Sequence, residues 1–382
     1  MKIAWMHSHF QNWMGGHKYV FEIVRQLKKN HQVEVFASTA SDYSRNQFKS
    51  QDVKLTTVNF TSTYNPLYWL ILPVMIALES AKLKNLTKDA DVIITSYFPS
   101  HLWAEKIGRP YFQICYEPLA FFYDNDLISS YPLLIRYFLN VMKKLYAGAD
   151  KKALLKAEKC FTLSVFNKKW TETVYGRDDI KVLYEGVDAD FFRPKYDKKL
   201  SERYRNKKII FHTTDFTKTK GTDILINSLP PVIEKFPETV LLISSTIKNS
   251  IEKNKLLKKA GKLGIFGNVI FLGYVDHRLL PAYYSIAKVV VQPSRFQSMS
   301  LAVKEAMACQ TPVITSLEGK EQFSSGSAGY LVDVNNISDL TENILRILSA
   351  ENSAKSMGEK GRQIVKEKFS WDAVSNKILS NL

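Results

Sequence analysis

Short apolar segments alternate with helical patterns along almost the whole chain of 382 residues, and this rhythm constrains the fold more than any other feature. Residues 2–6 predict a buried strand, and residues 16–29 predict a helix with one apolar face. Further short apolar strands are predicted at 32–37, 92–96, 111–115, 160–163 and 180–183. Strands that are apolar throughout and separated by helices are typical of parallel sheets covered on both faces.

The rhythm breaks once and then restarts. Residues 186–207 are rich in turn formers and charged side chains, which is typical of an interdomain linker. Strands are predicted again at 209–213, 239–245, 269–272, 288–292 and 312–315, and the helices between them include 221–235 and 301–309. We therefore predict an α/β chain with two doubly wound, Rossmann-like domains, 1–185 and 208–370, that face a central cleft. Ligands of such sheets bind outside the carboxyl ends of the strands.

Composition narrows the class of protein. Hydrophobic residues make up 45% of the chain and charged residues 24%, which excludes a collagen-like, coiled-coil, wholly disordered or polytopic membrane protein. The 53 Lys and Arg against 37 Asp and Glu leave a net charge of +16. This excess favours polyanionic partners: nucleic acid, an anionic membrane surface or phosphate-bearing substrates.

The three cysteines are too scattered for a disulfide framework or a zinc site. The first residues lack the apolar core of a signal peptide, so we expect a cytoplasmic protein. The apolar stretch 66–78 is shorter than the roughly 20 residues of a spanning helix, and Pro73 interrupts it. This stretch predicts a buried or interfacial helix.

Two glycine-containing connections are candidate anion sites. Gly15 and Gly16 lie between the first strand and the first helix, where backbone N–H groups can approach a ligand. Lys220 stands just before a helix that starts at Gly221. An ordinary tight connection and a solvated lysine remain the structural alternatives. The dinucleotide pattern Gly-x-Gly-x-x-Gly is absent from the first connection.

The segment 292–309 carries the most information. A strand ends in Pro293-Ser294, a loop of small polar residues follows, and an apolar helix then contains one acid, Glu305. A lone carboxylate in this place suits recognition of ligand hydroxyls. The alternative is an acid that interacts with the helix dipole.

This segment resembles the Pro-Ser-x-x-Glu-Gly-Phe-Gly-Leu pattern of the retaining glycosyltransferases of family four, which continues to a second Glu and Ala-Met-Ala. The resemblance covers nearly the whole chain and implies the GT-B fold, with residues 371–382 packed back on an acceptor-side first domain. Other matching pieces follow the family order: Gly15-Gly16, Glu185-Gly186-Val187-Asp188, Lys220-Gly221, Phe271-Leu272-Gly273-Tyr274-Val275, Thr311-Pro312-Val313-Ile314 and Phe369-Ser370-Trp371.

The resemblance also implies roles for single residues. Gly15, Gly16 and Lys220 would lie at the donor diphosphate, Tyr274 and Val275 at the base, and Glu305 at the ribose. The loop whose N–H groups approach the diphosphate and the sugar matches Gln297, Ser298, Met299, Ser300 and Leu301. The implied catalytic positions are Tyr116, Lys220 and Gln297.

Four positions depart from the family pattern. Gln297 replaces a glutamate, Asp215 an arginine, Tyr116 a histidine and Glu185 an asparagine. An amide still forms hydrogen bonds but carries no charge. A carboxylate at 215 is unfavourable beside a diphosphate, so either this loop points away or another cation, Lys218 or Arg295, substitutes.

The resemblance implies transfer of a hexose from a UDP- or GDP-sugar to a glycan or lipid-linked acceptor, in cell-envelope polysaccharide synthesis, with retention of configuration. It implies neither a metal nor a cofactor. The departures motivate a second interpretation, a catalytically weakened GT-B subunit that binds a sugar nucleotide or a partner enzyme. We do not expect nucleic acid as a partner, because no recognition-helix or RNA-binding pattern occurs.

Residues 133–160 combine seven basic and two acidic residues with apolar residues at helical spacing. A basic amphipathic helix predicts binding to an anionic membrane surface, which would place the protein at the inner face of the membrane. The alternative is a solvated face on a core helix. We interpret Asp188 and Asp190 as turn residues, and His7 and His9 as lining or structural residues, because no third metal ligand has suitable spacing.

Overall fold

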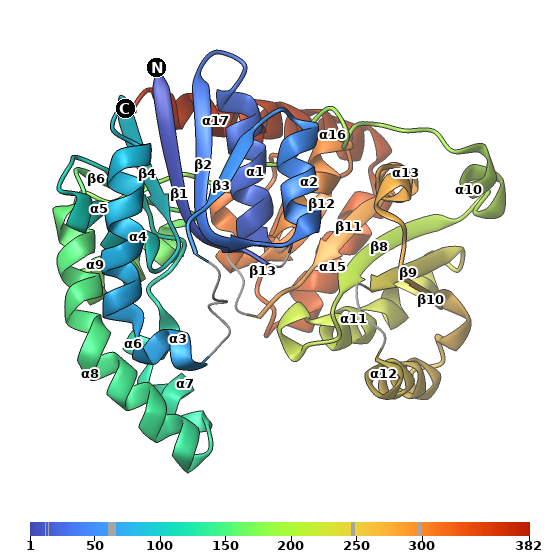
Figure 1. The fold of residues 1–382 in the computed structure, drawn as a ribbon. Coiled ribbons are helices and arrows are strands. Elements are labelled where there is room, and N and C mark those ends of the chain that lie inside the picture. The colour runs from blue at the N-terminus through green and yellow to red at the C-terminus, as the bar shows by residue number, and fades with distance from the viewer. Residues whose placement is uncertain (12, 14, 60–65, 246–248, 296–299) are drawn as a thin grey trace. The chain divides into compact units, whose positions relative to one another are not determined.

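The computed structural model describes residues 1–11, 13, 15–59, 66–245, 249–295 and 300–382. Contacts divide the chain into two units, residues 1–185 with 374–382, and residues 186–373. In each unit a parallel sheet is covered by helices (Figure 1). The prediction of an α/β chain with two parallel sheets is confirmed.

In the described part of the first unit, seven parallel strands lie in the order β3-β2-β1-β4-β5-β6-β7. Their central strand β1 pairs with both β2 and β4. The strands are β1 (Lys2–Phe10), β2 (Gln32–Ala40), β3 (Lys54–Thr57), β4 (Val92–Ser96), β5 (Phe112–Ile114), β6 (Lys159–Thr162) and β7 (Lys181–Val182). Strand β1 extends beyond the predicted residues 2–6 and includes His7 and His9.

Helices α1 and α2 cover one face of this sheet, whereas α4, α5 and α8 cover the other (Figure 1). The helices are α1 (Gly15–Leu27), α2 (Asp42–Ser50), α3 (Pro66–Leu70), α4 (Leu72–Leu86), α5 (Ser100–Ile107), α6 (Ala120–Tyr123), α7 (Asn125–Ser130), α8 (Leu133–Lys156), α9 (Val165–Tyr175) and α17 (Trp371–Leu379). The stretch 66–78, predicted as one helix, forms α3 and the start of α4. We find no helix in the described ranges that has the length and hydropathy to cross a membrane.

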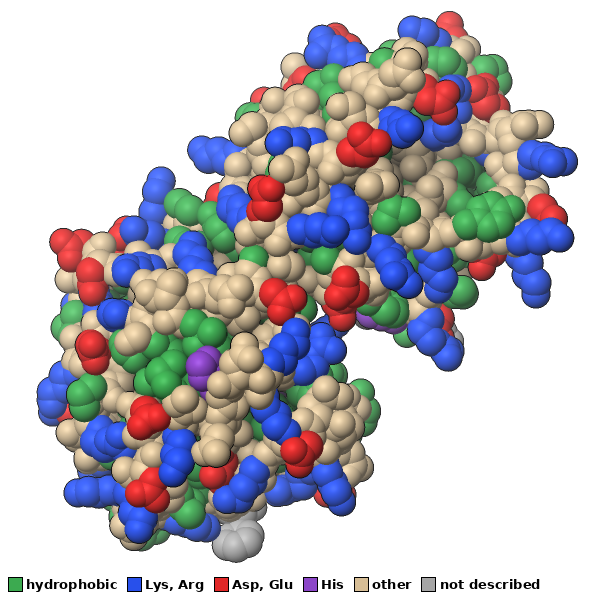
Figure 2. Space-filling model, turned by 90° about the horizontal axis from the view of Figure 1, so that it is seen from above, with side chains coloured by type: hydrophobic (Ala, Val, Ile, Leu, Met, Phe, Trp, Pro, Cys, Tyr) green, Lys and Arg blue, Asp and Glu red, His purple; other side chains and the backbone are tan. Residues whose placement is uncertain are grey.

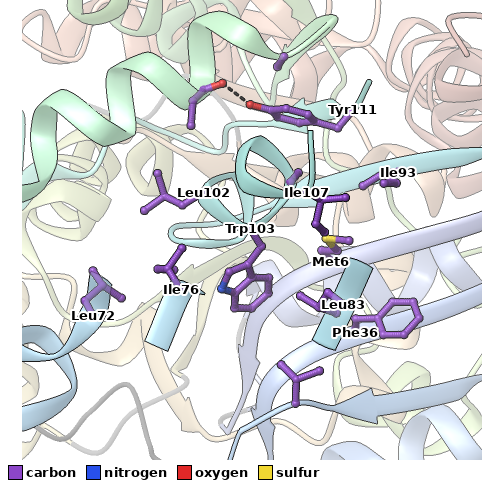
Figure 3. Packing of buried hydrophobic residues seen from close by; sticks show 14 of the residues in the cluster. Met6, Phe36, Leu72, Ile76, Leu83, Ile93, Leu102, Trp103, Ile107 and Tyr111 are labelled. Atoms are coloured by element: carbon purple, nitrogen blue, oxygen red, sulfur yellow. Dashed lines mark hydrogen bonds between the residues drawn. The ribbon is translucent and has the colours of Figure 1, made fainter. Parts of the chain in front are cut away.

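The core of the first unit lies between the sheet and α4, α5 and α8. Trp103 of α5 is fully buried there, among Met6 and Phe36 of the strands and Ile76 and Leu83 of α4 (Figure 3). The indole Nε1–H of Trp103 donates to the buried Glu79 carboxylate at 2.8 Å, so its polar group is satisfied inside the core.

The second unit repeats the architecture. In its described residues, six parallel strands lie in the order β10-β9-β8-β11-β12-β13: β8 (Lys208–Thr214), β9 (Thr239–Ser245), β10 (Val269–Gly273), β11 (Val289–Gln292), β12 (Val313–Ser316) and β13 (Gly329–Val332). The α-helices are α10 (Lys198–Arg203), α11 (Thr222–Lys235), α12 (Ser250–Lys262), α13 (Leu280–Ile286), α14 (Leu301–Ala308), α15 (Ile337–Ser349) and α16 (Glu351–Ile364). Helices α11 and α15 pack together over one face of the sheet.

Residues 186–207, predicted as a linker, belong by their contacts to the second unit. The amide of Val187 donates to Phe369 O at 2.7 Å, and Arg362 donates to Phe192 O at 3.1 Å. The carboxylate of Asp188 accepts from the amides of Asp190 and Phe191, at 3.1 and 2.9 Å. These bonds give Asp188 a turn-forming role.

Candidate functional site

Several candidate residues lie at the point in each sheet where the direction of chain connection reverses. In the second unit the chain runs from β8 outward to β10, and then from β11 outward to β13, so the reversal lies between β8 and β11. Lys220 follows β8, and Ser300 and Glu305 follow β11. In the first unit the reversal lies between β1 and β4, and Gly15 and Gly16 follow β1. Ligands of open α/β sheets bind at such reversals.

Gly221 brings the two loops of the second unit together. Its φ of 66° lies in the left-handed region, and a Cβ at this position would overlap the carbonyl oxygen of Pro293. Only glycine satisfies both demands. The short 3₁₀ turn Lys218–Lys220 therefore lies directly against the loop that follows β11, and Lys220 stands at the start of α11.

Arg295, a predicted substitute for the missing cation, has protein partners instead. Its amide donates to Thr219 O at 2.8 Å, and its guanidinium donates to Lys218 O. Two more bonds, of 3.0 and 2.8 Å, join the guanidinium to both carboxylate oxygens of Asp223. Burial raises the pKa of Asp223, but the hydrogen bond and charge of Arg295, together with a backbone hydrogen bond and Lys259, bring the pKa below its ordinary value. Arg295 thus ties the loop after β11 to the first turn of α11.

Asp215 forms hydrogen bonds within its own loop. Its carboxylate accepts from the Thr217 amide at 2.9 Å and from the Thr217 hydroxyl at 2.6 Å. Burial raises the pKa of Asp215, but these bonds and the charge of Lys220 bring the pKa below its ordinary value. The group is therefore ionised at neutral pH and lies close enough to Lys220 to reduce the positive potential there.

Glu305 lies in α14 and is only 7% exposed. The hydroxyl of Tyr284, in α13, donates to Glu305 Oε2 at 2.7 Å. Ser300 precedes α14 and is buried, and Leu301 begins the helix. The remaining predicted donor-loop residues, Gln297, Ser298 and Met299, lie outside the described residues.

The predicted base-binding pair follows β10 at the edge of the sheet, two strands away from β8. Gly273 has a φ of 71° and turns the chain. Tyr274 is then 71% exposed, whereas Val275 is buried. The Tyr274 ring and the backbone of this turn are therefore presented at the carboxyl end of β10.

In the first unit, Tyr116 lies against the glycine pair. A Cβ on Gly16 would come within 2.8 Å of the Tyr116 ring, and the Tyr116 hydroxyl donates to Gly16 O at 3.1 Å. Burial, with a contribution from the charge of Glu185, raises the pKa of Tyr116. Gly16 therefore makes room for Tyr116, which stays protonated and acts only as a hydrogen-bonding group near neutral pH.

A cavity of about 610 Å³ opens beside this contact. Gly15, Gly16 and Tyr116 line it. Its wall is otherwise largely aromatic and includes the side chains of His7, His9, His17, Tyr68, Trp69, Tyr97, Phe98 and Phe121. Sequence reasoning had found only the glycines, Tyr116 and the two histidines of β1. The position of His17 directly after Gly16 was the one further signal in the sequence, whereas the other aromatic residues come from separate segments of the chain, including α3 and α6.

The three histidines of the cavity are uncharged at neutral pH. Burial, followed by repulsion from His17 and His9, lowers the pKa of His7. Burial and His17 lower the pKa of His9 to about 4, and burial lowers that of His17. Within the ranges that the structure describes, no group of three His, Cys, Asp or Glu side chains is arranged to hold a metal ion.

Comparison with known families identifies the family of this chain. The model described as "Glycosyltransferase Family 4" matches residues 13–191, and the model described as "Glycosyl transferases group 1" matches residues 193–364. The chain belongs to the group 1 glycosyltransferases. The resemblance in the sequence is thereby confirmed over both units of this glycosyltransferase.

Two curated relatives illustrate the range of the family. Spore coat protein SA of Bacillus subtilis is 30% identical over 220 residues, which cover 53% of this chain and 58% of that protein. A GDP-mannose-dependent alpha-(1-6)-phosphatidylinositol monomannoside mannosyltransferase of Mycolicibacterium smegmatis is 28% identical over 202 residues, which cover 50% and 52%. The chain therefore spans little more than half the length of these relatives.

Solved structures match over the whole length of this glycosyltransferase. Anabaena Alr3699/HepE in complex with UDP has a TM-score of 0.76 at 16% identity and 100% coverage of both chains. A sucrose-phosphate synthase from Thermosynechococcus elongatus has a TM-score of 0.70 at 18% identity and covers 100% of this chain and 98% of its own. Together with the two parallel sheets, these matches show that the fold is GT-B.

Proposed function

We propose that this protein transfers a sugar from a UDP- or GDP-sugar to a glycan or lipid-linked acceptor, with retention of the anomeric configuration and without a metal ion. The observation that carries the proposal is the contact of Gly221 with Pro293, which joins the Lys220 turn to the loop leading to Glu305 where the sheet connections reverse. Structures of HepE with UDP and UDP-glucose, and the GDP-mannose dependence in the name of the M. smegmatis relative, support a nucleotide-sugar donor.

The donor would bind in two parts. The carboxylate of Glu305 would accept hydrogen bonds from the ribose hydroxyls, and the Lys220 ammonium would hold the diphosphate. As the anomeric C–O bond breaks, negative charge grows on the diphosphate. Lys220 and the backbone N–H groups at the start of α14 would stabilise this charge, each by about 3 kcal/mol if they act like oxyanion-hole donors. Gln297 would bind a sugar hydroxyl as a neutral partner.

The acceptor hydroxyl would attack from the face that the diphosphate leaves. A new C–O bond would form at the anomeric carbon, and the leaving diphosphate would take the proton of the hydroxyl. The protein then needs no base of its own, which suits a chain in which a protonated tyrosine, Tyr116, stands where the family has a histidine. The cavity beside Tyr116 supports an acceptor-side role for the first unit, because aromatic side chains pack against the apolar faces of sugar rings.

An anionic lipid surface is the proposed second partner of the first unit. Helix α8 begins with large apolar side chains in solvent: Leu134 is 84% exposed and Tyr137 73%. On α4, Val74 and Leu78 are also exposed. Basic residues lie farther along α8, although Lys152 and Lys156 contact Glu105. On the face shown in Figure 2, basic side chains are interspersed with acidic ones. Among its described residues, this face therefore has no extended patch of positive charge alone.

A weakened, non-catalytic subunit is the second candidate function, and Asp215 favours it. An ionised carboxylate near Lys220 lowers the affinity of the site for diphosphate. Such a subunit would still bind a sugar nucleotide or a partner enzyme. A subunit that binds a sugar nucleotide differs from the transferase in turnover rather than in nucleotide binding.

A thermal-shift screen with UDP, GDP and their sugars, followed by a hydrolysis assay of the nucleotide sugars that bind, tests the proposal. A ligand that binds the native state raises the apparent melting temperature. A shift together with slow release of nucleoside diphosphate supports the transferase, and a shift without release supports the binding subunit. If no sugar nucleotide raises the melting temperature, the transferase proposal is wrong, and only a subunit that binds a partner enzyme is left.

A further inference from the structure

A buried hydrogen bond joins Tyr284 to the carboxylate of Glu305. The Tyr284 hydroxyl donates to Glu305 Oε2 at 2.7 Å, and the whole tyrosine is buried. Bonds from a hydroxyl to a carboxylate are short and roughly twice as strong as neutral ones. The bond connects α13, which precedes β11, to α14, which follows it.

We infer that Tyr284 is a positioning residue of the donor site, which fixes the Glu305 carboxylate for the two ribose hydroxyls of a nucleoside diphosphate. This inference rests on the proposed function, in which Glu305 binds the ribose. A carboxylate offers about four acceptor positions, and the tyrosine uses one of them, on Oε2. Once its orientation is fixed, the group does not lose side-chain freedom when the ligand arrives, which preserves binding free energy.

The tyrosine ring is held independently of its hydroxyl. It packs edge-on against Phe211 at 5.3 Å and against Phe192 at 6.1 Å between ring centres. The carbonyl oxygen of Tyr284 accepts from the Thr311 hydroxyl at 2.7 Å. Removal of the hydroxyl alone should therefore leave the ring, helix α13 and the fold in place.

The hydroxyl is also protonated, and therefore a donor, at neutral pH. Burial and the neighbouring Glu305 charge raise the pKa of Tyr284 well above its ordinary value. The chain offers a matched control in Tyr283, which is the adjacent tyrosine of α13. Tyr283 is also buried and stacks on the same Phe211 at 5.8 Å.

The test is calorimetric binding of UDP and GDP, their 2′,3′-dideoxy forms and inorganic pyrophosphate to the parent protein, Tyr284→Phe, Tyr283→Phe and Glu305→Gln. We expect Tyr284→Phe to weaken the preferred ribonucleotide about tenfold, as for one lost hydrogen bond to a charged group. The loss should vanish with the dideoxy nucleotide and with pyrophosphate. Tyr283→Phe should match the parent, and the melting temperature of Tyr284→Phe should stay close to that of the parent.

The outcomes separate the inference from the proposed function. If Glu305→Gln weakens the ribonucleotide but Tyr284→Phe does not, the positioning role is wrong and the ribose contact stands. An equal loss for ribose and dideoxy ligands in Tyr284→Phe also overturns the inference, because it marks a general structural effect. If Glu305→Gln changes nothing, or the parent binds neither nucleotide, the ribose assignment of the proposed function fails and the inference fails with it.

Discussion

The guanidinium of Arg295 binds both carboxylate oxygens of Asp223, at 3.0 and 2.8 Å. This two-point geometry is the strong form of the arginine–carboxylate pair. It connects the loop after β11 with the first turn of α11 and gives Arg295 a structural task. Arg295 is therefore bound to Asp223, and in the proposed donor site the positive potential for a diphosphate would come mainly from Lys220.

Asp215→Asn should tighten the binding of UDP and GDP about three- to tenfold. The substitution removes a negative charge near Lys220, and an asparagine oxygen can still accept both bonds from Thr217. Isothermal calorimetry at low and high salt would measure the effect, which should shrink as salt screens the charges. Asp276→Asn, which removes the same charge beside Arg278, is the control. Unchanged or weaker binding in Asp215→Asn would show that this carboxylate does not oppose the ligand.

Lys220→Ala should weaken nucleoside diphosphates roughly 10- to 100-fold, as expected for one lost charged hydrogen bond. Affinity for a nucleoside without phosphates should not change. Lys218→Ala removes the same charge two residues earlier and should have a much smaller effect. If UDP and GDP bind equally well to Lys220→Ala, the phosphate role of this lysine is wrong.

Gln297→Glu tests why the chain lacks the first family glutamate. A hydrogen bond to a charged group contributes roughly 1.5–3 kcal/mol and a neutral one about 1. The variant should therefore bind or turn over a neutral sugar nucleotide better, with unchanged affinity for the free nucleoside diphosphate. With a uronic-acid donor the added charge should instead reduce activity. Assays with both donor types separate these cases, and no change in either would place Gln297 outside the sugar site.

His7, His9 and His17, which line the cavity beside Tyr116, have lowered pKa values, and these predict a loss of stability in mild acid. The folded-state pKa of His9 is about 4, below the ordinary value of 6.5, so the unfolded chain takes up the proton first. The His9 contribution to the free energy of unfolding therefore falls as pH drops from 6.5 to about 4. Between pH 7 and pH 5 the loss is about 2 kcal/mol. Urea unfolding at the two pH values should show a smaller loss in His9→Asn than in the parent. Equal losses would contradict the assignment.

Leu134→Glu should reduce binding to anionic vesicles about tenfold, because it removes an exposed apolar side chain from the first turn of α8 and adds a repelled charge. The parent should bind anionic but not neutral vesicles, and less strongly at high salt. Tyr196→Glu is the control, since Tyr196 is 77% exposed in the second unit. Equal binding of the parent to both vesicle types would show that the binding is not electrostatic. Undiminished binding of Leu134→Glu would show that the start of α8 does not contact the membrane.

The sequence predicted the interior strands better than the edges of the sheets. The bounds of β4 and β9 agree with the apolar runs, because interior strands of a covered parallel sheet are apolar on both faces. The strands β3 and β13 were missed, and both lie at sheet edges. In β3, Lys-Leu-Thr-Thr contains a single apolar residue. An edge strand pairs with only one neighbouring strand, so it does not need a continuous run of apolar residues.

Only some residues of the candidate site could likewise be predicted from the sequence. Lys220 and Glu305 were found because they belong to a family pattern with fixed local spacing. Tyr284 lies 21 residues before Glu305, and no spacing rule connects them. The two residues meet only because α13 and α14 flank the same strand, β11. The wall of the cavity lined by His7, His9 and His17 likewise combines residues of strands, helices and loops that are far apart in the sequence, so only the folded chain shows it.

The contact of Gly221 with the carbonyl of Pro293 has a consequence for engineering. It joins backbone to backbone, so no change of rotamer can relieve a shift of either loop. The turn that carries Lys220 and the segment after β11 must therefore be exchanged as one cassette. A chimera that takes only one of them from a relative should misplace the other, and libraries aimed at donor choice should leave both of these backbones intact.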